Sequence, residues 1–256
     1  MAIKKSPRPR SGKLSGARAG AAPRQRVFIE DLVAASRILA RHGVLDAYGH
    51  VSARSLDRPD RFFMSRSLAP ALVTAADIME LDLDSEAAGG DTRKRFVECY
   101  IHGEIYRARA DVMAVVHSHS SSVIPFGITA KPLRPVYHMG AFLGTGTPLF
   151  EIRNAGGNTD LLVRDRYLGK ALAEVLGACT CVLMRGHGMT VVGASIPEAV
   201  FRAFYTDANA RIQLHAEGLG GPINSLNAEE GKLATDSIRG TITRPWELWK
   251  REVLGK

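Results

Sequence analysis

The sequence lacks the features that would place a protein in a membrane or outside the cell. It holds only three cysteines, Cys99, Cys179 and Cys181, which cannot form an even framework of disulfides. It contains no run of eighteen uninterrupted apolar residues, so we predict no transmembrane helix and no membrane partner. Its basic start is not followed by the apolar run of a secretory signal. These absences favour a reducing, cytoplasmic location.

Acidic residues are absent from residues 1–26. The basic residues of that segment are Lys4, Lys5, Arg8, Arg10, Lys13, Arg18, Arg24 and Arg26. They account for the whole net charge of +8, so residues 27–256 are neutral overall. A nucleic-acid-binding protein would need basic residues on its folded surface, and we therefore expect no nucleic-acid partner. We interpret residues 1–26 as a disordered basic tail, either a solubilising arm, which we favour, or a contact for an anionic partner.

Helical and strand patterns alternate over residues 27–256, which indicates one α/β domain with a C-terminal helical extension. Apolar residues make up 45% of the chain, enough for a sizeable core. Apolar spacing and capping residues predict helices at 28–42, 95–110, 168–176, 196–217 and 244–254. Strands are predicted at 51–54, 61–64, 114–119, 133–137, 147–152 and 181–193, with a further one within 78–91.

Two histidines, His117 and His119, end the apolar run at 114–119. Side chains at positions i and i+2 of a strand face the same side, so both imidazoles can bind one metal ion. The motif alone is weak, because two surface histidines at a strand end are the simpler interpretation.

A third histidine, His187, lies between Gly186 and Gly188 in a tight turn. Flanking glycines let the backbone pack closely against a neighbour, although the histidine could also be incidental to a hairpin tip. Three neutral imidazoles with an open position form a catalytic zinc site. Glu98, near the start of a helix, could complete such a site, but the helix dipole alone favours an acid there.

The order and spacing of four features resemble the class II aldolase/adducin family over about residues 28–218. The features are YGHVSAR at 48–54, Glu98, AVVHSHS at 114–120 and LMRGHGM at 183–189. The resemblance implies a three-layer α/β/α sandwich around a mostly antiparallel sheet. It also implies a homotetramer with active sites between neighbouring subunits.

The same resemblance implies roles for the site residues. His117, His119 and His187 would bind a divalent metal, and Glu98 would be the acid–base residue. Zinc is the favoured metal for three histidine ligands, and Mn²⁺, Fe²⁺ and Co²⁺ are the alternatives.

Several positions depart from the sugar-phosphate aldolases of this family, which hold a phosphate with short polar side chains. The substituted or neighbouring pocket positions are His50, Ser52, Arg66, Ser67, Phe96 and Val97. Arg66 can bind a carboxylate through two nitrogens, and Phe96 would suit an aromatic ring. A tyrosine acid that those aldolases receive from a neighbouring subunit aligns with His138, beside Tyr137.

This altered set resembles the decarboxylase branch of the family, whose members act on dihydroxyphthalate and 3-hydroxy-2-methylpyridine-4,5-dicarboxylate. We therefore expect a metal-dependent carbon–carbon lyase that releases CO₂ from a hydroxylated aromatic or heteroaromatic carboxylate. Glu98 or His138 would deliver a proton to the ring. His50, Ser52, Arg66, Ser67, Phe96 and Tyr137 would bind the substrate.

Two other functions stay open at this point. One is an aldolase that cleaves a sugar phosphate or another aldol, which the loss of the Ser-Ser pair at 96–97 disfavours. The other is an adducin-like interaction module without chemistry, which has no need of the three histidines and Glu98. The sequence does not name the substrate ring, because a family fold alone does not determine a reaction.

Overall fold

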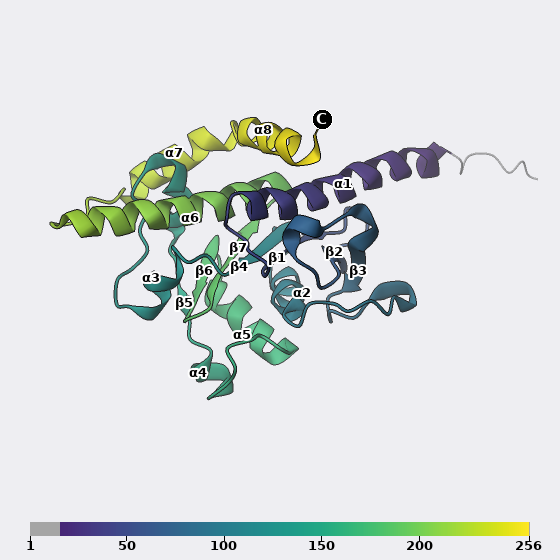
Figure 1. Ribbon diagram of the computed structural model, residues 1–256, viewed down its shortest axis with the longest axis horizontal. Coiled ribbons are helices and arrows are strands. Elements are labelled where there is room, and N and C mark those ends of the chain that lie inside the picture. The colour runs from purple at the N-terminus through teal and green to yellow at the C-terminus, as the bar shows by residue number, and fades with distance from the viewer. Residues whose placement is uncertain (1–15, 256) are drawn as a thin grey trace, which may run out of the picture.

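A seven-stranded sheet divides the molecule into two helical layers (Figure 1). The computed structural model describes residues 16–255, and it describes side chains from Pro23 onward. The strands follow the order β3-β2-β1-β4-β7-β6-β5, and every neighbouring pair is antiparallel except β5 and β6. The strands are β1 His50–Arg54, β2 Arg61–Ser65, β3 Ile78–Asp82, β4 Ala114–Ser118, β5 Leu149–Phe150, β6 Cys181–Met184 and β7 Gly188–Gly193. The expected sandwich with a mostly antiparallel sheet is confirmed.

One face of the sheet carries two long helices, α1 Gly16–Arg41 and α6 Ile196–Leu219, which lie above the sheet in Figure 1. Helix α8 Thr243–Leu254 packs on α1 and α6, and α7 Ala228–Arg239 packs on a 3₁₀ helix, η4 His138–Thr145. The apolar core on this face includes Leu39, Val116 and Trp249. In the C-terminal helical extension, α8 therefore covers the two long helices, whereas α7 covers η4.

The opposite face carries α2 Cys99–Ala108 and α5 Arg166–Leu176, which pack against each other. A second apolar core, with Phe62, Ile105 and Leu172, lies between these helices and the sheet. Short helices complete the structure: α3 Ile124–Ile128, α4 Arg153–Gly156, η1 Pro70–Leu72, η2 Ala75–Asp77 and η3 Ala88–Gly90.

The alternation of side chains along β4 decides where the functional residues lie. Ala114 and Val116 belong to the core under α1 and α6, whereas Val115 belongs to the core under α2 and α5. Because successive strand residues point to opposite faces, His117 faces the same way as Val115. The same argument places His50 on β1 toward α2, since Val51 points into the other core. The site is therefore built on the α2 and α5 face.

Two helix starts follow the capping pattern in the sequence. The Asp165 carboxylate accepts a hydrogen bond from the Leu168 N–H at 2.9 Å and opens α5. The Ser195 hydroxyl accepts from the Glu198 N–H at 3.2 Å and opens α6. Each cap satisfies a backbone donor that the helix itself leaves unpaired, which explains why both starts were predictable.

The predicted strand at 133–137 is wrong. Pro132 and Pro135 lack the N–H that a strand ladder needs, and the segment instead pairs with amide side chains of α6. Asn209 accepts from the Val136 N–H at 2.9 Å and donates to the Arg134 carbonyl at 2.7 Å. Gln213 does the same for the Arg134 N–H and the Pro132 carbonyl, both at 2.9 Å.

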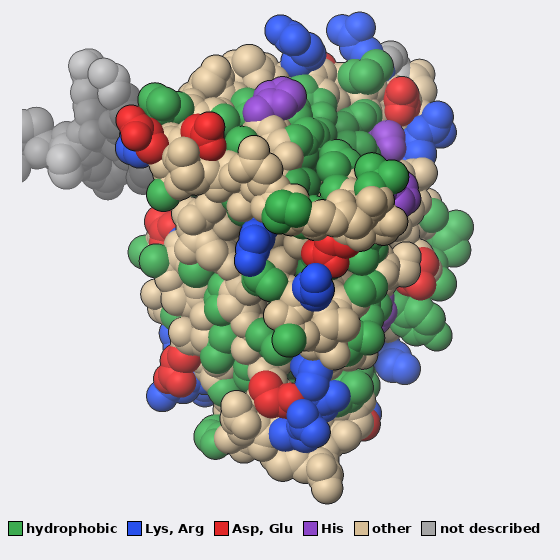
Figure 2. All heavy atoms as spheres, turned by 90° about the vertical axis from the view of Figure 1, so that its left-hand side faces the viewer, with side chains coloured by type: hydrophobic (Ala, Val, Ile, Leu, Met, Phe, Trp, Pro, Cys, Tyr) green, Lys and Arg blue, Asp and Glu red, His purple; other side chains and the backbone are tan. Residues whose placement is uncertain are grey.

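The basic segment differs in part from its expected disorder. Residues 1–15 lie outside the described residues, whereas residues 16–26 belong to α1, which contains Pro23. No helix among residues 16–255 is both long and apolar enough to cross a lipid bilayer. On the face shown in Figure 2, basic side chains lie among acidic ones rather than in one continuous patch.

Candidate metal centre and active site

Four side chains that could hold a metal ion converge on one point. The ligand atoms of Glu98, His117, His119 and His187 all lie within 4.8 Å of one another. His117 comes from β4, His119 follows the end of β4, and His187 lies in the turn between β6 and β7. Glu98 immediately precedes α2. The structure thus brings together the four residues that the sequence analysis grouped.

The three imidazoles meet through their Nε2 atoms. The Nε2 atom of His119 lies 3.1 Å from that of His117 and 3.0 Å from that of His187. The Oε2 atom of Glu98 lies 3.5 Å from the Nε2 atoms of both His117 and His187. Three nitrogens and one carboxylate oxygen therefore surround a common centre.

Backbone carbonyls set the orientation of two of these rings. The Nδ1 atom of His117 lies 3.1 Å from the Met189 carbonyl oxygen, and that of His187 lies 2.9 Å from the Leu161 carbonyl oxygen. A carbonyl oxygen only accepts, so each Nδ1 donates, and in the form of the ring that binds a metal the lone pair lies on Nε2. Lone pairs that converge at these distances need a positive charge between them. This donor set fits a divalent metal, and a carbonyl on the far nitrogen is typical of metal-binding histidines.

Glu98 is held in its charged form. Burial raises its pKa, but His117 and His187 lower it by more, so the pKa of this carboxyl lies well below its usual range. Its second oxygen, Oε1, accepts a hydrogen bond from the Val163 N–H at 2.9 Å. Burial together with His117 and His187 lowers the pKa of His119 to about 4, so that ring is neutral near pH 7. A charged carboxylate and a neutral imidazole are the forms that bind metals.

Two glycines let the backbone pack directly against the histidine segment. A Cβ atom on Gly188 would lie 2.0 Å from the Ser118 carbonyl oxygen, and one on Gly49 would lie 2.8 Å from the His117 carbonyl oxygen. Both residues also have positive φ angles, +157° for Gly188 and +82° for Gly49. The close packing predicted for the glycines beside His187 is therefore present at Gly188.

The predicted pocket residues His50 and Phe96 lie together beside the histidine cluster. His50 is directly opposite His117 in the β1–β4 pair, and the centroids of their rings are 5.1 Å apart. The Phe96 ring is 4.6 Å from the His50 ring. The imidazole and the phenyl ring together form an aromatic wall next to Glu98.

Ser52 does not have the surface that its predicted role in substrate binding requires. It is fully buried, and its hydroxyl is bonded to His102 at 2.6 Å and to Tyr106 at 2.7 Å. His102, on α2, is bonded to this Ser52 hydroxyl through Nδ1 and to His50 through Nε2, the latter at 2.7 Å. Ser52 and His102 thus support the pocket from behind.

The other predicted substrate residues lie elsewhere on the chain. The Nε atom of Arg66 forms a 2.7 Å salt bridge with Asp77, and the Ser67 N–H donates to the Lys94 carbonyl at 2.7 Å. None of their hydrogen bonds within residues 16–255 reaches the histidine cluster. Their role in binding stays a prediction.

His138 begins η4 and lines a small cavity with Phe142, Phe201 and Arg202. Its ring and that of Tyr137 are 5.9 Å apart, and neither contacts the histidine cluster among the described residues. Their predicted roles depend on a neighbouring subunit, and they too stay predictions.

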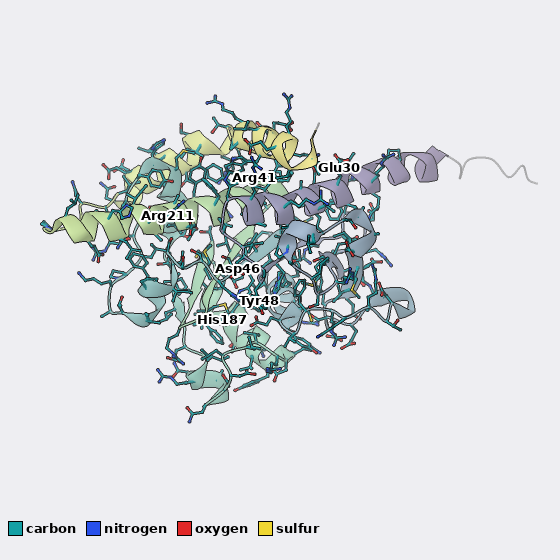
Figure 3. All side chains as sticks on the ribbon, in the orientation of Figure 1. Glu30, Arg41, Asp46, Tyr48, His187 and Arg211 are labelled. Carbon is teal, nitrogen blue, oxygen red and sulfur yellow. The ribbon has the colours of Figure 1, made fainter. Side chains whose placement is uncertain are left out.

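Tyr48 is a candidate that the sequence analysis missed. Its side chain is 68% exposed, yet its ring is stacked on His119 with centroids 6.2 Å apart. Its N–H donates to the Asp46 carboxylate at 2.7 Å, which fixes the turn before β1. Asp46, Tyr48 and His187 are labelled near one another at the centre of Figure 3. The available signal was an aromatic residue immediately before Gly49 and His50.

Comparison with known proteins now decides the family. The family model of the class II aldolase and adducin N-terminal domain matches residues 30–214. The chain belongs to this family. The match spans all four metal-binding candidates and confirms the resemblance that was based on the four sequence features.

Individual relatives refine the comparison. The chain is 40% identical to "Decarboxylase tropJ" of Talaromyces stipitatus, over 88% of this chain and 93% of that protein. It is 34% identical to a 3,4-dihydroxyphthalate decarboxylase of Arthrobacter keyseri, over 77% of this chain and 82% of that protein. Among solved structures, an L-fuculose 1-phosphate aldolase from Glaciozyma antarctica PI12 matches with a TM-score of 0.75 and 21% identity, covering 95% of this chain and 93% of that one. The structural match shows that the fold is shared.

Proposed function

We propose that this protein is a metal-dependent carboxy-lyase that releases CO₂ from a hydroxylated aromatic or heteroaromatic carboxylate. The observation that carries the proposal is the joint position of the Glu98–histidine cluster and the aromatic wall of His50 and Phe96. Relatives whose names describe decarboxylases, one of them for 3,4-dihydroxyphthalate, support the same reaction class.

The substrate class follows from what surrounds the cluster. Phe96 and the exposed ring of Tyr48 offer flat apolar surfaces to an aromatic ring. Arg66 has no hydrogen bond to the cluster among the described residues, and its part in the proposal comes from the sequence: it would bring the positive charge that holds a second carboxylate, with Asp77 bonded to its Nε atom. A sugar phosphate would find few short hydroxyl donors at these positions.

The reaction needs a place for the electrons that remain when the bond to the carboxyl carbon breaks. A divalent cation bound by His117, His119 and His187 would supply the positive charge that stabilises them. Glu98, ionised and fixed by the Val163 N–H, would accept a proton from the substrate hydroxyl or return one to the ring. His138 is the alternative proton donor if a homotetramer places it in a neighbouring site.

The finer parts of the proposal are the metal, the assembly and the location. Zinc suits three imidazoles, and Mn²⁺, Fe²⁺ or Co²⁺ would accept the same ligands. For the assembly and the location, we propose a homotetramer in the cytoplasm.

The test combines metal analysis of the purified protein with a screen for CO₂ release. The screen offers hydroxylated phthalates and pyridine dicarboxylates, with fuculose and rhamnulose phosphates as the competing class. We expect bound divalent metal and CO₂ from at least one hydroxyaromatic acid. Aldol cleavage of a sugar phosphate without any CO₂ release would refute the decarboxylase and favour the aldolase.

A further inference from the structure

A buried chain of hydrogen bonds runs from α2 to the wall of the active site. It links the Tyr106 hydroxyl to Ser52 Oγ at 2.7 Å, Ser52 Oγ to His102 Nδ1 at 2.6 Å, and His102 Nε2 to His50 Nδ1 at 2.7 Å. Ser52 and His102 are completely buried, and Tyr106 and His50 are 2% and 5% exposed. The described residues thus form a continuous polar path within an otherwise apolar core.

The phenol end fixes the direction in which the hydrogens point. Burial raises the pKa of Tyr106, so the phenol keeps its hydrogen. Ser52 is the side-chain partner of this hydroxyl among residues 16–255. The opposite direction would leave a buried phenol hydrogen without an acceptor, which is an unfavourable arrangement. Tyr106 therefore donates to Ser52.

The remaining hydrogens follow from that first bond. Ser52 has one hydrogen and donates it to Nδ1 of His102. Burial lowers the pKa of His102 to about 3, so the ring is neutral and its single proton lies on Nε2. That proton is donated to Nδ1 of His50. A neutral His50 must then carry its own proton on Nε2.

We propose that Tyr106, Ser52 and His102 act as positioning residues that hold His50 in its Nε2–H tautomer, as a fixed hydrogen-bond donor to an oxygen of the substrate. His50 lies beside His117 and Phe96, on the face of the sheet that carries the metal-binding cluster. An N–H donor attracts a carboxylate or phenolate oxygen, whereas the other tautomer would present a lone pair and repel it. The part of this inference that concerns the substrate rests on the proposed function.

The tautomer can be measured directly in the full-length, zinc-loaded protein. Nitrogen-15 NMR of histidine-labelled protein distinguishes a protonated ring nitrogen from a bare one, and the signals missing in His50→Gln identify His50. We expect a directly bonded proton on Nε2 and a bare Nδ1. A proton on Nδ1 of His50 would overturn the inference whatever the substrate is.

The role of His50 in substrate binding is tested with Ser52→Ala, which interrupts the chain of hydrogen bonds. Ser36→Ala is its matched control. Ser36 is also a buried serine, but its hydroxyl is bonded to the Leu32 carbonyl within α1. In Ser52→Ala we expect both tautomers of His50 and about tenfold weaker binding of phthalate, with unchanged zinc content. Ser36→Ala should keep one tautomer and the normal affinity.

Each outcome separates the two proposals. Unchanged phthalate affinity in a Ser52→Ala protein with mixed tautomers would overturn the binding role. The Nε2–H tautomer in a protein that releases no CO₂ from any hydroxyaromatic acid would refute the proposed function alone. If Ser52→Ala does not fold, the tautomer measured in the wild-type protein still tests the first part of the inference. The phthalate affinity of Tyr106→Phe, which we also expect to fall, then tests the binding role.

Discussion

His50 and His117 face each other across two neighbouring antiparallel strands, with their ring centroids 5.1 Å apart. β1 and β4 occupy the third and fourth places in the sheet, so each is paired with a strand on both sides. A predicted pocket residue and a candidate metal ligand are therefore fixed relative to each other by the backbone ladder. Such a site needs little side-chain rearrangement before it can bind a substrate.

The first prediction concerns the metal. We expect His117→Ala, His119→Ala and His187→Ala each to lose stoichiometric zinc, because each substitution removes one of three nitrogens that meet at a single point. Metal content is measured on dialysed protein by mass spectrometry. His215→Ala removes an exposed histidine of α6 and should retain the metal. Full metal content in all three cluster variants would contradict the site.

The second prediction concerns Glu98. Glu98→Gln preserves the shape of the side chain and can still accept a hydrogen bond from the Val163 N–H. The amide is uncharged and cannot take up or release a proton as a carboxylate does. We expect normal folding and a loss of turnover on the order of a hundredfold or more. Glu104→Gln is the matched control, since Glu104 is a buried acid of the same helix that pairs with Arg107 and Arg166. Equal turnover losses in the two variants would indicate that Glu98 is only structural.

Local sequence signals predicted most of the fold. The helix capped by Ser195 begins at the predicted Ile196, and the helix capped by Asp165 begins at Arg166, two residues before its predicted start. The strand expected at 133–137 failed because proline removes ladder donors, and the partners that replace them, Asn209 and Gln213, are distant in sequence. The tail was predicted to end at residue 26 because acidic residues are absent up to that point, whereas α1 already begins at Gly16.

The residues of the histidine cluster were easier to predict from the sequence than the residues that support His50 from behind. The candidate metal ligands could be grouped because strand alternation pairs His117 with His119, and because the order and spacing of the motifs resemble the family and so add His187 and Glu98. The chain of hydrogen bonds from Tyr106 to His50 could not be predicted, because it joins α2 to β1 through contacts that no local sequence pattern encodes. Ser52 was assigned to the substrate from its neighbourhood in sequence, whereas its side chain points into the core.

The third prediction concerns Arg66. Its Nε atom is occupied by Asp77, and its terminal nitrogens make no hydrogen bond to any residue within 16–255, so they are available for a carboxylate. A lysine presents its N–H donors from a single nitrogen, so it lacks the planar fork with which Arg66 can hold Asp77 through Nε and a carboxylate through its two terminal nitrogens. We therefore expect Arg66→Lys to raise KM for a dicarboxylate by roughly tenfold, with less effect on a monocarboxylate. Steady-state kinetics on the two acids measure the ratio.

Arg58→Lys provides the control for that substitution. Arg58 also forms a salt bridge, with Glu80, and the arginine is exposed. Its replacement should leave both KM values unchanged. If the ratio of the KM values for the dicarboxylate and the monocarboxylate is the same in Arg66→Lys as in wild type, Arg66 does not belong to the binding site.

The last prediction concerns Tyr48, the exposed ring beside His119. An aromatic side chain that is 68% exposed gains little from the fold, yet this one is fixed between the Asp46 turn and Gly49, whose backbone packs on His117. Such a ring can stack with an aromatic substrate, which contributes roughly 0.5–1.5 kcal/mol beyond the area it buries. We expect Tyr48→Ala to raise KM for the hydroxyaromatic acid roughly three- to tenfold, and Tyr48→Phe to stay near wild type.

The control for Tyr48 separates stacking from a general effect of losing a surface tyrosine. Tyr167 on α5 is 66% exposed, so Tyr167→Ala removes a similar amount of exposed ring away from the cluster. Metal content and melting temperature should be unchanged in all three variants, because neither tyrosine belongs to the buried core. If Tyr48→Ala loses zinc together with affinity, the ring supports His119 rather than the substrate. A KM change confined to Tyr48→Ala, with zinc retained, is the result that stacking on the substrate requires.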